Sequence, residues 1–218
     1  MIKIERNPNP PPSLAIEERK AHGLYNKSDV IQQLKEDSHD KCYICELNKL
    51  TDSEVEHLRP HHGRTISERV FDWNNLFYAC PHCNNIKKES KYDDKIIDCC
   101  VEDPEELLEQ SYKDGHVTVH NIVDGEQAIM TAELITECFE KRNTGIREAA
   151  CQARINRLAE EMNVLYKTLE KYSKNPGKTR YMSSLESSLS RKSAFSAFKR
   201  NYVRKHISDY PDLQAFLE

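Results

Sequence analysis

Three histidines stand within six positions in the stretch EVEHLRPHHG, residues 54–63. Histidine side chains bind zinc, activate water by taking a proton near neutral pH, or contact phosphate. They also occur in polar loops without a functional role. The carboxylate of Glu56 directly precedes His57, whereas His61 and His62 come just before a glycine in a polar segment. The stretch by itself leaves these alternatives open, and its neighbours on both sides narrow them.

Two Cys-x-x-Cys pairs flank the stretch, CYIC with Cys42 and Cys45 and CPHC with Cys80 and Cys83. Each pair bends the chain so that two thiolates converge, and two such pairs complete a tetrahedral zinc site. Four protein ligands leave no open position, so we expect this Zn²⁺ to be structural. A redox role is disfavoured, because no thioredoxin-like pattern accompanies the pairs. We expect the other cysteines to be ordinary buried or half-buried residues: Cys99, Cys100, Cys138 and Cys151.

The elements around these motifs can be inferred from their residue patterns. Residues 54–58 and 70–79 predict strands, joined by a polar loop. A helix is expected from Pro81 to about Ser90, since proline is accepted in a first helical turn. Together these elements place the chain in the α+β class.

The two ends of the chain differ in character. Residues 7–13, NPNPPPS, predict extended polyproline-like chain, and a helix capped by Ser28 follows to about Glu36. Apolar residues between 155 and 172 recur in steps of three and four, which indicates a helix that packs on another helix of the chain. Further along the chain we expect a short helix at 104–111, a strand at 116–123, and helices at 131–143 and 182–206.

Composition describes a polar chain of 218 residues with 38% hydrophobic and 31% charged residues and a net charge of −4. The start carries no apolar run typical of a secretion signal, and no segment approaches the roughly 18 apolar residues of a membrane span. We therefore expect a cytoplasmic protein without membrane contact. The net charge conceals two segments of opposite sign. Residues 93–109 contain eight acids and one base, and residues 174–205 contain nine bases and one acid. The basic tail predicts contact with phosphates or an acidic partner, or else a solvated helical face.

Several motifs taken together resemble the zinc-stapled HNH endonucleases over residues 42–88. They are, in chain order, Glu56-His57, Asn75-Leu76 and the run Cys80-x-x-Cys83-Asn84-x-x-Lys87. The resemblance implies a ββα-metal fold, in which a β-hairpin and a helix hold one catalytic metal. Phosphodiester hydrolysis needs a base to activate water and a cation to offset charge on the phosphate and the leaving oxygen.

The resemblance also implies roles for individual residues. His57 is the implied general base, Asn75 the residue that holds it in place, and Glu56 and Asn84 the ligands of a catalytic Mg²⁺ or Mn²⁺. The residues expected to contact nucleic acid are Lys87, Lys88, Arg59 and Arg64.

Two features set the chain apart from many HNH relatives, which have aspartate in place of Glu56 and histidine in place of Asn84. Neighbours on a regular strand also face opposite ways. Glu56 and His57 therefore share one metal site only if the strand ends or bulges there, as Pro60 permits.

A looser likeness over roughly residues 1–145 resembles the HNH nuclease subunit of Septu anti-phage systems and retron-associated HNH proteins. It implies a bacterial defence effector that cleaves nucleic acid, with DNA favoured, in a hetero-oligomeric complex with an ABC-type ATPase. The chain has no phosphate-binding Walker loop of its own. The proline-rich start and the helical C-terminal region are candidate docking surfaces.

We accordingly predict a zinc-stapled ββα-metal core with an N-terminal helix and a largely helical C-terminal region. The predicted parts are residues 1–40, an extended segment and helix; 41–125, the nuclease core; and 126–218, the helical region with its basic tail. Two alternatives remain open. One is a non-catalytic zinc module that binds nucleic acid or bridges partner subunits, and the other is an HNH nuclease that cleaves RNA, such as tRNA.

Overall fold

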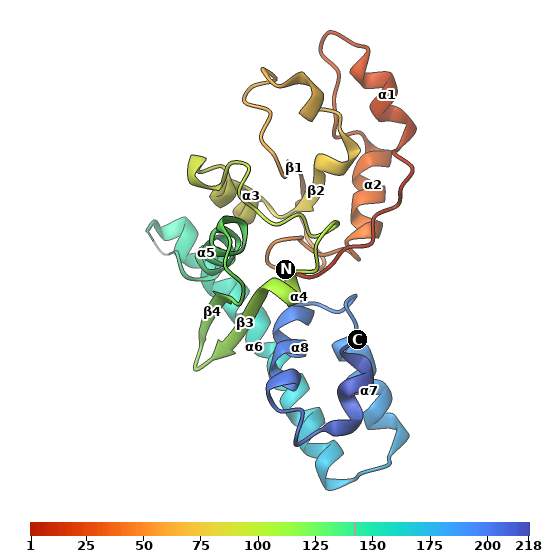
Figure 1. The fold of residues 1–218 in the computed structure, drawn as a ribbon, viewed down its shortest axis with the longest axis vertical. Helices are drawn as coiled ribbons and strands as arrows, with labels where there is room; N and C mark the ends of the chain where they lie inside the picture. Colours follow the sequence, from red (N-terminus) through yellow and green to blue (C-terminus); the bar gives the residue numbers. More distant parts are fainter. Residues whose placement is uncertain (142) are drawn as a thin grey trace.

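The computed structural model describes residues 1–141 and 143–218 and has a mixed α+β architecture with two small antiparallel sheets. The helices are α1 (Pro12–Glu18), α2 (Ser28–Asp37), α3 (Pro81–Lys87), α4 (Pro104–Leu107), α5 (Glu126–Glu140), α6 (Gly145–Lys174), α7 (Thr179–Leu189) and α8 (Ser196–Lys205). The strands are β1 (Glu54–His57), β2 (Leu76–Ala79), β3 (Leu108–Lys113) and β4 (His116–Asn121). Figure 1 shows α1, α2, β1 and β2 at one end of the molecule and α7 and α8 at the other.

The first sheet is an antiparallel pair whose register aligns Glu54 with Ala79 and His57 with Leu76. Helix α3 follows β2 directly and packs against β1. Pro81 occupies the first turn of α3, where its missing N–H costs no helical hydrogen bond. The expected order of two strands and a helix is therefore present, and these three elements carry most of the candidate site residues.

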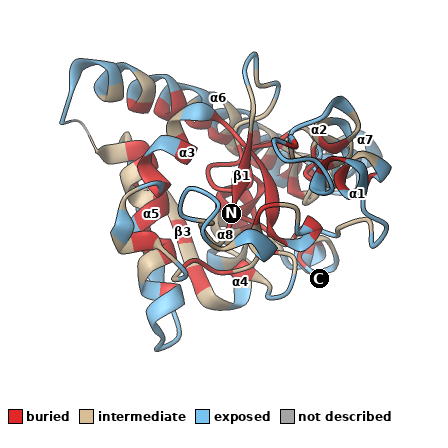
Figure 2. Cartoon of the chain, turned by 90° about the horizontal axis from the view of Figure 1, so that it is seen from above, coloured by how far each residue is buried: buried red, intermediate tan, exposed pale blue. Residues whose placement is uncertain are grey.

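Two hydrophobic clusters support this arrangement. A small one, under α1 and α2, holds Val55 and Trp73 against the outer face of the β1–β2 pair. A large one runs from the cysteine pairs through α5 to α8, and it includes Met1 and Ile4. The start of the chain is therefore packed, not free. Figure 2 shows the buried residues gathered along β1 and on the inward sides of the helices.

Three local predictions before the C-terminal region were wrong, each for an identifiable reason. Residues 70–79 do not form one strand, because the Asp72 side chain accepts a hydrogen bond from the Asn74 N–H and caps a 3-10 turn at Trp73–Asn75. The helix expected at 104–111 stops at Leu107, since strand pairing with β4 begins at the next residue. The polyproline-like start gives way to α1 at Pro12.

The C-terminal region is helical, as expected, and the apolar positions from Ile155 to Tyr172 on α6 are buried inside the chain. The single helix predicted at 182–206 is instead two helices, α7 and α8. The break ends at Phe195, which adopts the left-handed conformation with φ of 51°. Within the described parts of the chain, no helix combines the length and apolar character that crossing a bilayer requires.

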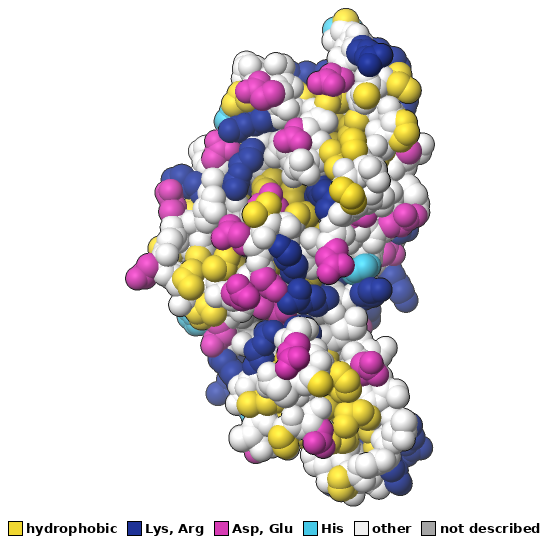
Figure 3. All heavy atoms as spheres, turned by 45° about the vertical axis from the view of Figure 1, so that its right-hand side comes forward, with side chains coloured by type: hydrophobic (Ala, Val, Ile, Leu, Met, Phe, Trp, Pro, Cys, Tyr) yellow, Lys and Arg dark blue, Asp and Glu magenta, His cyan; other side chains and the backbone are white. Residues whose placement is uncertain are grey.

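The basic tail meets the acidic segment of its own chain. Arg200 Nε lies 2.8 Å from Glu105 Oε1, and Arg191 and Arg204 also pair with this carboxylate. Lys205 pairs with Glu109 in the same way. Figure 3 shows acidic and basic side chains interspersed over one face of the molecule, without a large patch of a single sign. Much of the tail's charge is therefore neutralised within the fold.

Candidate functional site

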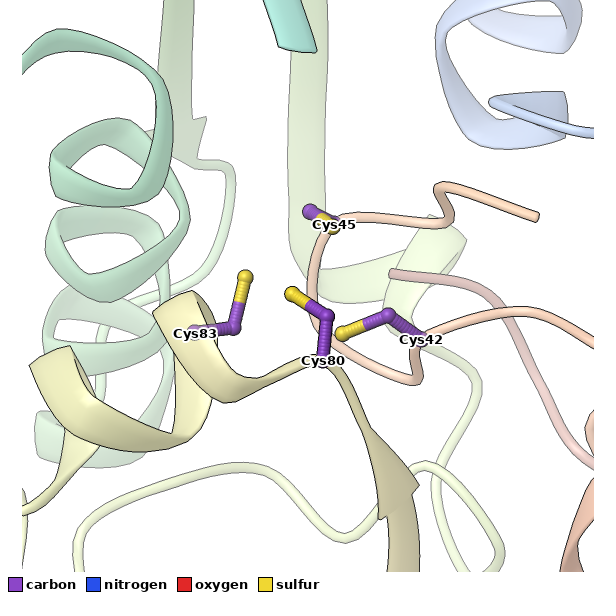
Figure 4. A group of neighbouring side chains, drawn as sticks. All are labelled: Cys42, Cys45, Cys80 and Cys83. Carbon is purple, nitrogen blue, oxygen red and sulfur yellow. The ribbon is translucent and has the colours of Figure 1, made fainter. Parts of the chain in front are cut away.

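The four cysteines of the two Cys-x-x-Cys pairs converge. Cys42 and Cys45 lie on a tight turn after α2, held by the Glu46 N–H donating to the Cys42 carbonyl at 2.9 Å. Cys80 and Cys83 lie at the junction of β2 and α3. All four sulfur atoms lie within 4.8 Å of one another and are buried, and Figure 4 shows them pointing toward a common centre. Four buried thiolates at this spacing fit a metal such as zinc in tetrahedral coordination.

His57 is the last residue of β1, and its ring is held on three sides. Its Nε2 lies 3.1 Å from the Val70 carbonyl oxygen. A carbonyl only accepts hydrogen bonds, so Nε2 carries the proton and Nδ1 keeps its lone pair. The rings of Tyr25 and His61 each lie edge-on to the His57 ring, with 4.5 Å between the ring centroids. Burial lowers the pKa of His57 below its ordinary value of 6.5, so the neutral ring is favoured at neutral pH.

An open cavity of about 490 Å³ brings the candidate residues together. Glu56, His57, Asn84, Lys87 and Lys88 all line it. β1 ends at His57, and the neighbouring strand residues Glu56 and His57 both line the cavity. A carboxylate, an imidazole and an amide thus face the same space.

Glu56 is buried and makes two side-chain contacts. Its Oε1 lies 2.7 Å from the Lys87 ammonium, and its Oε2 accepts a hydrogen bond from the Tyr43 hydroxyl. Lys87 also donates to the carbonyls of His57 and Leu58, at 3.1 and 3.0 Å. Lys87 is only 4% exposed, so it ties α3 to the end of β1 rather than presenting its charge at the surface.

Asn84 lies on α3, and its amide nitrogen donates to the carboxylate of Glu54. Its Oδ1 is therefore the atom oriented for a metal or water. Glu54 was not among the predicted site residues, although it lies two residues before Glu56 and so on the same face of β1. It orients the Asn84 amide.

Asn75 does not bond to the His57 ring. Its Nδ2 donates to the carbonyls of Arg59 and Arg69, at 2.9 and 3.0 Å, and its Oδ1 accepts from the Arg59 N–H at 2.7 Å. These bonds fasten both ends of the loop between the strands. The second end leads into Val70, whose carbonyl holds His57, so Asn75 orients the histidine through the backbone.

The other residues predicted to contact nucleic acid differ in where they lie. Lys88 is exposed and lines the cavity, whereas Arg59 and Arg64 do not line it. The Arg64 side chain instead donates to the Gly23 carbonyl at 2.7 Å. His61, which the sequence places in a polar segment before a glycine, packs against His57, and so does Tyr25. No sequence pattern marks Tyr25, because it reaches the site from the distant segment before α2.

No protein-family model matches the chain, and no curated protein matches it. The chemistry inferred for the site therefore rests on its own residues and their geometry.

Proposed function

We propose that this protein is a metal-dependent endonuclease that hydrolyses phosphodiester bonds of nucleic acid, with DNA the favoured substrate. One observation carries the proposal. The His57 ring is fixed through Nε2 to a backbone carbonyl, keeps Nδ1 as a base, and lines a cavity with a carboxylate and an amide oxygen. A neutral, oriented imidazole is what activation of water near pH 7 requires.

The oxygen atoms of Glu56 and Asn84 fit a Mg²⁺ or Mn²⁺ ion, because such ions prefer oxygen ligands and retain several waters. These side chains line one cavity, and water completes the coordination of such sites in proteins. The neighbouring Lys87 ammonium offsets part of the Glu56 charge, which favours modest affinity for the ion. A bound ion would supply positive charge to the phosphate and the leaving oxygen.

The chain's own residues would divide the remaining work. His57 accepts the proton of the attacking water at Nδ1. Asn75 and Lys87 hold the backbone around His57 in place, and the Lys87 ammonium pairs with the Glu56 carboxylate. Lys88, exposed at the cavity, contacts a phosphate of the substrate.

The setting we propose is bacterial anti-phage defence, with an ABC-type ATPase of the Septu kind as the partner in a hetero-oligomeric complex. The support is the looser sequence resemblance over roughly residues 1–145 that is described under Sequence analysis. Because the chain lacks a Walker loop, ATP hydrolysis would belong to the partner. Co-purification of the full chain with such an ATPase, and then measurement of the mass of the complex, tests this part separately.

The non-catalytic alternative loses support from the fold. Its main support was the basic tail, and Arg191, Arg200, Arg204 and Lys205 already pair with Glu105 and Glu109. The RNA alternative stays open, because the proposed contacts are to the phosphate, which DNA and RNA share, and not to the bases.

Incubation of the purified protein with plasmid DNA and with cellular RNA tests the proposal. The assay is run with Mg²⁺, with Mn²⁺ and with EDTA, each with and without the ATPase subunit. We expect cleavage with a divalent ion that EDTA abolishes. No cleavage of either substrate under any condition would contradict the proposal and favour the non-catalytic zinc module. Cleavage of RNA alone would change the substrate class while leaving the site assignment in place.

A further inference from the structure

A buried arginine lies against the cysteine cluster, outside the candidate active site. Arg154 comes from α6 and is 6% exposed. Its Nη2 lies 3.0 Å from Cys80 Sγ, and its Nη1 donates to the Ala150 carbonyl at 2.8 Å. Among the residues that the structure describes, no carboxylate pairs with it.

Burying a guanidinium without a counter-ion costs free energy. The negative charge of the cysteine thiolates is the nearby charge that can offset this cost. Four thiolates around Zn²⁺ carry a net charge of −2, since four negative charges meet two positive ones. The guanidinium therefore halves the excess negative charge of the centre. The cluster and the arginine stabilise each other, and α6 is held against the zinc site by this contact.

The four ligands differ in their access to solvent. Cys80 lines an open hollow of about 550 Å³, together with Arg154 and Arg157, whereas the other three cysteines do not line it. Cys80 is 3% exposed, while the other three are fully buried. Of the four ligand residues, Cys80 is therefore the one that borders the hollow, and Arg154 lines the same hollow and contacts the Cys80 sulfur.

We infer that Arg154 shields the zinc centre at Cys80, and that Cys80 is the ligand at which the centre is first modified by an electrophile. A hydrogen bond to a metal-bound thiolate draws electron density from the sulfur and slows its attack on electrophiles. Loss of the bond exposes the sulfur through the hollow. This inference concerns the zinc centre alone and does not depend on nuclease activity.

Iodoacetamide provides the test, because its reaction is fully defined. The Cys80 sulfur attacks the methylene carbon, a sulfur–carbon bond forms and iodide leaves. The resulting thioether is neutral and a weaker ligand, so zinc is released. Zinc release to a coloured chelator gives the rate, and peptide mass spectrometry at partial reaction gives the order in which the four ligands are modified.

The matched variants are Arg154→Met, which removes the charge, Arg154→Lys, which retains it, and Arg157→Met, which alters the same hollow one turn away. We expect release about tenfold faster in Arg154→Met, within the range known for partners of metal ligands. Arg154→Lys should be intermediate, and Arg157→Met should match the wild type.

In the wild type, Cys80 should be the first of the four ligands to be alkylated, a result that needs no variant to fold. Equal release rates in the wild type and a folded Arg154→Met would overturn the shielding role. First modification at Cys42, Cys45 or Cys83 would overturn the choice of Cys80. Wild-type protein purified without zinc would overturn both.

Discussion

Replacing Asn75 with alanine removes three hydrogen bonds at once, two donated to carbonyls and one accepted from an N–H, at 2.7 to 3.0 Å. The side chain is buried. A buried hydrogen bond contributes about 1 kcal/mol net, so the three together are worth about 3 kcal/mol. For a domain of this size that corresponds to a decrease in melting temperature of roughly 6 to 12 °C.

Urea unfolding monitored by circular dichroism, with zinc present throughout, measures this loss. The neighbouring Asn74 is the matched control, because it is exposed. Asn74→Ala should change the free energy of unfolding by less than about 0.5 kcal/mol. If Asn75→Ala unfolds within about 1 kcal/mol of the wild type, Asn75 does not fasten the loop, and its role in orienting His57 fails with it.

Three further predictions test other parts of the fold. Glu105→Gln leaves three arginines without their shared carboxylate. Since this side chain is 5% exposed, we expect the free energy of unfolding to fall by about 3 kcal/mol. The exposed Glu106→Gln should leave it unchanged in the same urea titration. The midpoint of the acid limb of kcat/KM against pH should lie below pH 6.5. Burial lowers the pKa of His57, so the base stays neutral to lower pH. A midpoint above 6.5 would contradict His57 as the base. Removing zinc with a chelator should lower the melting temperature by more than about 10 °C, and an unchanged melting curve would show that the four cysteines need no metal.

The four-cysteine cluster was predictable from sequence because its signal is local. Two residues between paired cysteines fix how each pair bends, and two pairs suffice for a tetrahedral site. The structure brings all four sulfurs together as expected. Arg154 could not be found in this way, because it contacts Cys80 from 74 positions along the chain.

The hairpin and the helix after it were also predictable, since alternation and Pro81 mark them. The turn at Trp73–Asn75 was missed because the Asp72 side chain competes for backbone hydrogen bonds that a strand would use. That competition depends on a single side-chain contact, which strand alternation does not reveal.

The acidic and basic segments are visible in the sequence, but their pairing with each other is not. Sequence composition left the basic tail to a partner or to solvent, because charge runs give no information on contacts between distant segments. Packing of α8 beside β3 brings Arg200 and Arg204 to Glu105, which lies in α4 just before β3. Lys87 illustrates the same limit, since its helical position predicted a phosphate contact and its side chain faces Glu56 instead.

Single-turnover cleavage by His57→Ala is the decisive measurement for His57 as the base of a nuclease site. His62→Ala is the matched control, because His62 lines the same cavity but is exposed and is not the proposed base. Both proteins should retain zinc and the wild-type melting temperature. We predict that His57→Ala loses at least about a hundredfold in cleavage rate while His62→Ala stays near the wild type. Cleavage by folded His57→Ala at the wild-type rate would contradict the assignment of His57 as the base.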